Sequence, residues 1–160
     1  MTMRNGTVVV VALALILALC GIPAFAQDKP ADNMQLVRDK IKADKKLFVG
    51  EAMQLTDSEQ KGFWPVYDDY QKDWMKLNDR SANLIKQYAD NYKSMTNDVA
   101  KRLTDDFMAI RSDQQKLREA YLPKFRRVLP EMKVARYYQL ENKIEAVVDY
   151  ELAMNIPLVK

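Results

Sequence analysis

The chain has no histidine and a single cysteine, Cys20, among its 160 residues. Without histidine, neither a Ser-His-Asp triad nor a histidine general base can be built, and histidine cannot ligate a metal. A lone cysteine cannot form a disulfide within the chain, and the usual nitrogen–sulfur sites for transition metals are excluded as well. We therefore expect a protein that is not an enzyme and that uses no cofactor.

Glycine is also scarce, because only Gly50 and Gly62 occur beyond residue 26. Glycine weakens a helix interior by about 1 kcal/mol, so long stretches without it favour continuous helix. Beyond residue 26 the sequence has no alternating β-branched run and no Asn-Gly or Asp-Gly hairpin pair. These absences predict an all-α fold.

The first 26 residues have the three-part pattern of a secretory signal peptide. Arg4 supplies a positive charge, Val8–Cys20 is an apolar run of thirteen residues, and Ala24 and Ala26 are the small residues of a cleavage site. The run is shorter than the ~20 residues of a spanning helix. We expect cleavage after Ala26, a periplasmic location without a stable membrane anchor, and one domain over residues 27–160. An uncleaved anchor is the alternative.

Apolar residues at helical spacing predict four helices. The first begins at Asp32 or Asn33 and ends or is interrupted at Gly50. The second runs over 57–95, because Thr56 and Glu59 form a capping box at its start. Its apolar seam follows a heptad pattern. The seam residues are Phe63, Tyr67, Tyr70, Trp74, Leu77, Ser81, Leu84, Tyr88, Asn91 and Met95.

The third helix is capped by Thr96 or Asn97 and ends near Leu129, and Pro130 starts a fourth that stops before Pro157. Since the turn at Ser94–Asn97 is short, the second and third helices must form an antiparallel hairpin. Pro65 and Pro123 lie at nearly equal distances from this turn. We therefore predict a long proline-kinked hairpin with shorter flanking helices; helix breaks at the two prolines are the alternative.

Fourteen aromatic residues follow residue 26, and we expect a thin hairpin to leave some of them exposed. Exposed aromatic side chains on a concave face would bind apolar polypeptide segments, and nearby cations would steer acidic ones. The candidate client-binding residues are Phe63, Trp64, Tyr67, Tyr121, Phe125, Tyr137, Tyr138, Lys124, Arg126 and Arg127. The alternative is an aromatic core covered by the fourth helix. Although basic and aromatic residues alternate here, the export signal argues against nucleic acid.

Carboxylates recur along two of the predicted helices. The two rows are Asp68, Asp69 and Asp73, and Glu141, Glu145 and Asp149. Such oxygens could bind a hard cation such as Ca²⁺, but no loop of alternating oxygen ligands is present. We therefore expect no metal site, and interpret the rows as solvated helix faces with lysine partners.

The segment Leu55-Thr56-Asp57-Ser58-Glu59 resembles the LTxxQ motif found at helix starts in Spy/CpxP-type periplasmic proteins, with Glu59 in place of glutamine. Leu103-Thr104 repeats the first two positions without the glutamine, and Leu129 precedes a helix but lacks the threonine. The resemblance implies an envelope-stress chaperone or adaptor that forms a cradle-shaped antiparallel homodimer and needs no ATP.

The leading hypothesis is therefore an ATP-independent periplasmic chaperone, a homodimer that holds unfolded or misfolded envelope proteins on an aromatic and basic concave surface. Two alternatives remain. One is a regulatory interaction protein that docks on an envelope sensor. The other is a metal-responsive helical protein that uses the carboxylate rows.

Overall fold

The computed structural model describes residues 44–159. The expected all-α fold is confirmed, because this part of the chain contains four α-helices and no strand. The helices are α2 (Lys45–Met53), α3 (Asp57–Asn91), α4 (Asn97–Arg126) and α5 (Glu131–Asn155), with a 3-10 turn at Tyr92–Ser94. The expected signal peptide and the start of the first expected helix lie outside the described residues.

Side-chain caps set three of the helix starts. The capping box of α3 is confirmed: the Thr56 N–H donates to Glu59 Oε2 over 2.8 Å, and the Glu59 N–H donates to Thr56 Oγ1 over 3.3 Å. Thr96 caps α4 by accepting from the Val99 N–H, and Asp44 caps α2 by accepting from the Leu47 N–H. These bonds satisfy backbone donors that have no partner inside the helix.

The expected helix end at Gly50 is wrong, because α2 continues through it to Met53. A Cβ built at Gly50 would lie 3.5 Å from the Trp64 ring, an ordinary contact distance, so α2 packs beside Trp64 of α3 at this point. Burial of Phe48 and Met53 stabilises the helix on either side. The helix ends where Gln54 adopts a left-handed conformation with φ 48°.

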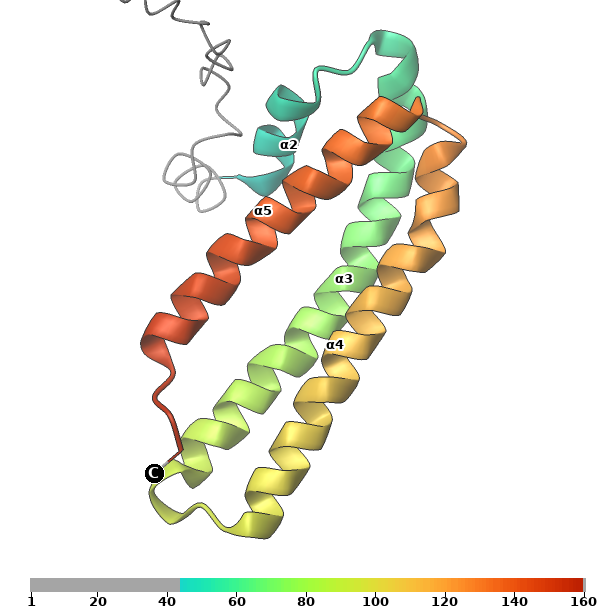
Figure 1. Ribbon diagram of the computed structural model, residues 1–160. Helices are drawn as coiled ribbons and strands as arrows, with labels where there is room; N and C mark the ends of the chain where they lie inside the picture. Colours follow the sequence, from blue (N-terminus) through green and yellow to red (C-terminus); the bar gives the residue numbers. More distant parts are fainter. Residues whose placement is uncertain (1–43, 160) are drawn as a thin grey trace, which may run out of the picture.

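Helices α3 and α4 form the predicted antiparallel hairpin, and α5 runs back across it (Figure 1). Both Pro65 and Pro123 lie inside helices, so the alternative of helix breaks is wrong. The rings of Phe63 and Phe125 are 5.8 Å apart, which places the two proline turns at the same level of the hairpin. Helix α2 packs against α5 at that end.

Burial is unevenly distributed along the hairpin. We call the end where α3 begins and α4 ends the aromatic half, since the main core cluster, which includes Phe63, Tyr70 and Phe125, lies there. The other end, which contains the α3–α4 turn, is the turn half. In the seam of α3, the residues from Phe63 to Leu77 are buried, whereas those from Ser81 onward are partly exposed.

Helix α5 lies close to the hairpin in the aromatic half and diverges from it toward the turn (Figure 1). None of the helices within residues 44–159 combines the length and the apolar character that crossing a bilayer requires.

Candidate functional site

Most of the predicted client-binding aromatics belong to the core. Their burial corrects the expectation of an exposed aromatic face and confirms the alternative of an aromatic core covered by the fourth helix. The buried residues are Phe63, Tyr67, Tyr121, Phe125 and Tyr137. The physical reason is that α5 lays Tyr137 into the hairpin, where its ring lies 4.5 Å from that of Phe125 and 5.2 Å from that of Phe63.

Trp64 and Tyr138 lie at the edge of this core and are partly buried. Lys46 stands 5.3 Å from the Trp64 ring, and the Tyr138 hydroxyl donates to the Arg118 carbonyl over 2.8 Å. Burial raises the pKa of Tyr138 to about 12. Burial and a hydrogen bond to Asp73 raise the pKa of Tyr121 to about 12 as well. Both phenols therefore stay protonated near neutral pH.

The predicted cations do not form one surface with these aromatics. Lys124 lies over the Tyr121 ring at 3.7 Å, Arg126 pairs with Glu131 at 3.1 Å, and Arg127 is exposed. Each of the three points outward from the end of α4, whereas the aromatic rings point into the core. No concave cationic and aromatic surface is therefore formed by these ten residues.

Two further cations, Lys133 and Arg136 of α5, hold α2 in place. Lys133 Nζ donates to the carbonyls of Met53 and Gln54, at 2.9 and 2.5 Å, and Arg136 Nε donates to the Ala52 carbonyl at 2.7 Å. These carbonyls end α2 and have no partner within the helix. Positive charge is favourable at this end of the helix dipole. The two side chains thus have a structural role that charge patterning alone did not reveal.

Cations pair with carboxylates of both rows. Asp68 pairs with Lys46, and Asp73 accepts from Lys76 and from the Tyr121 hydroxyl, two bonds that lower the pKa of Asp73. Within residues 44–159, no three ligating side chains are grouped so that they could hold a metal ion. The first row instead joins helices: Asp68 of α3 pairs with Lys46 of α2, and Asp73 of α3 accepts from Tyr121 of α4.

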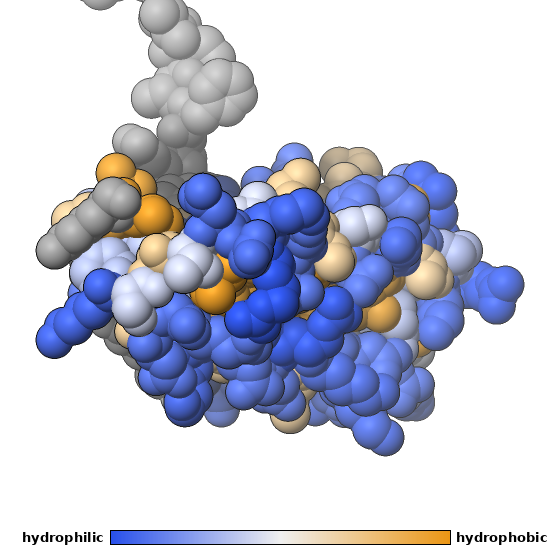
Figure 2. All heavy atoms as spheres, turned by 90° about the horizontal axis from the view of Figure 1, so that it is seen from below, coloured by the Kyte–Doolittle hydropathy of each residue, from blue (hydrophilic) through white to orange (hydrophobic). Residues whose placement is uncertain are grey.

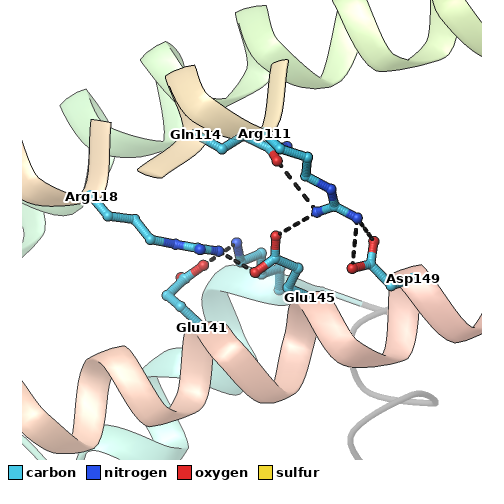
Figure 3. Close-up of polar contacts among 7 residues, drawn as sticks. Arg111, Gln114, Arg118, Glu141, Glu145 and Asp149 are labelled. Carbon is cyan, nitrogen blue, oxygen red and sulfur yellow. Dashed lines mark hydrogen bonds and ion pairs between the residues drawn. The ribbon is translucent and has the colours of Figure 1, made fainter. Parts of the chain in front are cut away.

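The second row forms a polar layer between α4 and α5 (Figure 3). Arg111 donates to Glu145 at 3.0 Å and to both oxygens of Asp149 at 2.8 Å. Arg118 also pairs with Glu145. Closer to α2, the buried Glu141 accepts from Lys45 at 2.9 Å. Charged pairs thus replace apolar packing as α5 moves away from the hairpin.

Exposed apolar side chains are concentrated in the turn half. We call the following set the turn-half apolar surface: Phe107, Met108, Val148, Tyr150, Met154, Leu158 and Val159. Its residues come from α4, α5 and the segment after α5. Figure 2 views the molecule from this end and shows apolar side chains between charged ones. A shallow hollow nearby is mainly polar and is lined by Arg80, Asn83, Leu84, Gln87, Asp106 and Ile110.

Comparison with family models, curated proteins and solved structures gives no significant match to this chain. The functional proposal therefore depends on its own residues. Sequence reasoning missed the turn-half apolar surface, although a signal was present. In α4, Met108 lies outside the row of buried residues that includes Leu103 and Ile110. In α5, Tyr150 and Met154 lie outside the buried face that includes Ile144 and Val147.

Proposed function

We propose that the protein is an exported, ATP-independent binding protein of chaperone type, which holds unfolded polypeptides on the turn-half apolar surface. The observation that supports this proposal most directly is the exposure of large apolar side chains there: Met108 is 62% exposed, Met154 68% and Phe107 47%. Exposed apolar groups that gather on one part of a protein are typical of binding sites.

The chemistry of these side chains suits varied clients. Methionine is unbranched and polarisable, so it adapts to partners of different shape, and an aromatic ring adds a large contact area. Charged residues such as Lys101 and Asp105 lie on the same helix and keep the surface hydrated. A surface of this kind binds many sequences weakly and does not need one shaped pocket.

The test is aggregation of a chemically unfolded model protein, followed by light scattering in the absence of nucleotide. We expect residues 27–160 to suppress scattering at near-stoichiometric amounts. Phe107→Ser combined with Met108→Ser should weaken suppression severalfold, because the two substitutions remove exposed apolar contacts on α4 without touching the core. Met132→Ser is the matched control, since Met132 is 87% exposed but begins α5 in the aromatic half.

Equal suppression by all three proteins would contradict the assignment of the surface. No suppression by the unaltered protein would contradict the chaperone proposal itself. The alternative would then be the regulatory protein with one dedicated envelope partner, which a pull-down from envelope extract would recover as a single stoichiometric species.

A further inference from the structure

The last twelve described residues, 148–159, lie outside the core. Val147 is the last buried residue in the described part of the chain, and every residue from Val148 to Val159 is partly or fully exposed. We call residues 148–159 the C-terminal strap. It comprises the end of α5 and the segment that returns toward the hairpin turn (Figure 1).

Polar contacts join the strap to the hairpin near its start and near its end. Near its start, both carboxylate oxygens of Asp149 accept from Arg111 Nη2, each over 2.8 Å. Near its end, the Tyr88 hydroxyl donates to the Pro157 carbonyl at 2.6 Å. One contact reaches α4 and the other reaches α3, so the strap crosses the hairpin.

The side of the strap that faces the hairpin also carries apolar residues. Asp149, Leu152 and Ile156 are spaced by three and four residues, which places them on one side of a helix. Leu152 and Ile156 are partly buried, unlike the exposed Tyr150 and Met154 on the other side. The strap therefore presents one carboxylate and an apolar row to the hairpin.

The hairpin side complements this chemistry. The Arg111 guanidinium lies 5.4 Å from the Phe107 ring, so a cation and an aromatic surface are adjacent. Arg111 and Phe107 both keep more than a third of their side chains exposed even with the strap in place. Tyr88 supplies a hydroxyl donor for a backbone carbonyl.

We propose that the strap covers part of a site on the hairpin, at Phe107 and Arg111, where an apolar polypeptide segment carrying a carboxylate docks. Such a segment displaces the strap and then contacts the hairpin part of the turn-half apolar surface. This inference rests on the proposed function in naming an unfolded client as the natural ligand. Displacement is feasible because the strap buries no side chain fully and because partly exposed ion pairs are weak. The apparent affinity for the client is then reduced by the fraction of molecules in which the strap is docked.

The test uses a fluorescent synthetic peptide with the sequence of residues 148–159 as the probe. The strap-released protein is the full mature chain with Asp149→Asn and Leu152→Ser, which leave the hairpin side unchanged. We expect the released protein to bind the peptide about tenfold more tightly than the unaltered protein does. Adding Arg111→Gln should abolish the gain.

The matched control is Arg80→Gln in the released protein. Arg80 also forms a 2.8 Å ion pair between helices, but its partner is Asp113 of α4 and not a residue of the strap. The control should bind the peptide as the released protein does. A peptide in which asparagine replaces the aspartate should bind about tenfold more weakly than the probe, since Arg111 then loses its charged partner.

Three results would overturn the inference: no peptide binding by the released protein, equally tight binding by the unaltered protein, or association of the released protein with a second copy of itself in place of the peptide. Circular dichroism melting should show that the released protein stays folded, and Asp149→Asn alone provides a milder release if it does not. Because the peptide assay uses no aggregating client, its failure would leave the aggregation result for the proposed function intact.

Discussion

Phe125 is one of the predicted client-binding residues whose burial gives it a role in the core. It is fully buried, and its ring contacts those of Phe63, Tyr137 and Tyr138. Phe125→Ala should therefore lower the free energy of unfolding by about 3–5 kcal/mol, since it leaves a cavity among packed rings. Urea unfolding measures this loss. Phe107→Ala is the control and should change stability by less than about 0.5 kcal/mol.

A Phe125→Ala protein with an unchanged urea midpoint would show that this side chain is not part of a packed core.

At the scale of single residues, the sequence predicted which helix face carries the apolar residues, because Phe63, Tyr67 and Tyr70 follow the heptad spacing. It could not predict their exposure. Exposure depends on a third helix, and spacing within α3 contains no information about where Tyr137 of α5 packs.

The start of α3 is an element whose stability should depend on pH. The hydrogen bond from the Thr56 N–H is the main cause that lowers the pKa of Glu59 in the folded protein. The ionised Glu59 carboxylate therefore stabilises the folded protein fully at pH values above the pKa that Glu59 has in the unfolded chain. This stabilisation is lost as the pH falls through the lower pKa that Glu59 has in the folded protein. Glu59→Gln keeps a neutral acceptor and removes this dependence. Urea midpoints of the two proteins should differ near neutral pH and converge under acid conditions.

A constant difference between the urea midpoints of the two proteins over the whole pH range would contradict a role for the Glu59 charge.

Helix boundaries were predicted well where a side-chain cap sets them, as at Thr56 and Thr96. They were predicted poorly where packing decides. At Gly50 the local preference for ending a helix was outweighed by the burial of Phe48 and Met53, and by contact with Trp64 of α3.

At the scale of the whole molecule, the aromatic core at one end predicts a gradient of local stability along the hairpin. Amides near Tyr70 and Tyr121 should exchange with deuterium close to the rate set by global unfolding. Amides near Leu84 and Phe107 should exchange at least about tenfold faster, because fewer buried contacts oppose local opening there. Mass spectrometry of peptides from the two halves measures the difference, and uniform protection would contradict the gradient.

The hairpin itself was predictable, since a short turn between two long apolar seams leaves few other arrangements. The course of α5 was not, because its apolar residues could have packed on either side of the hairpin. Ion pairs such as Arg111–Asp149 join residues 38 positions apart, and helical spacing alone does not select such partners.

The contacts of α2 also constrain the order in which the chain can fold during synthesis. The carbonyls that end α2 are bound by Lys133 and Arg136, which lie 79 to 84 positions later, and Lys45 reaches Glu141, 96 positions later. Helix α2 therefore emerges from the ribosome well before the residues that bind its end. The α3–α4 hairpin needs only neighbouring sequence and can form while the chain grows. Closure of the core therefore waits for α5, and until then the apolar faces of the hairpin and of α2 remain open to other molecules.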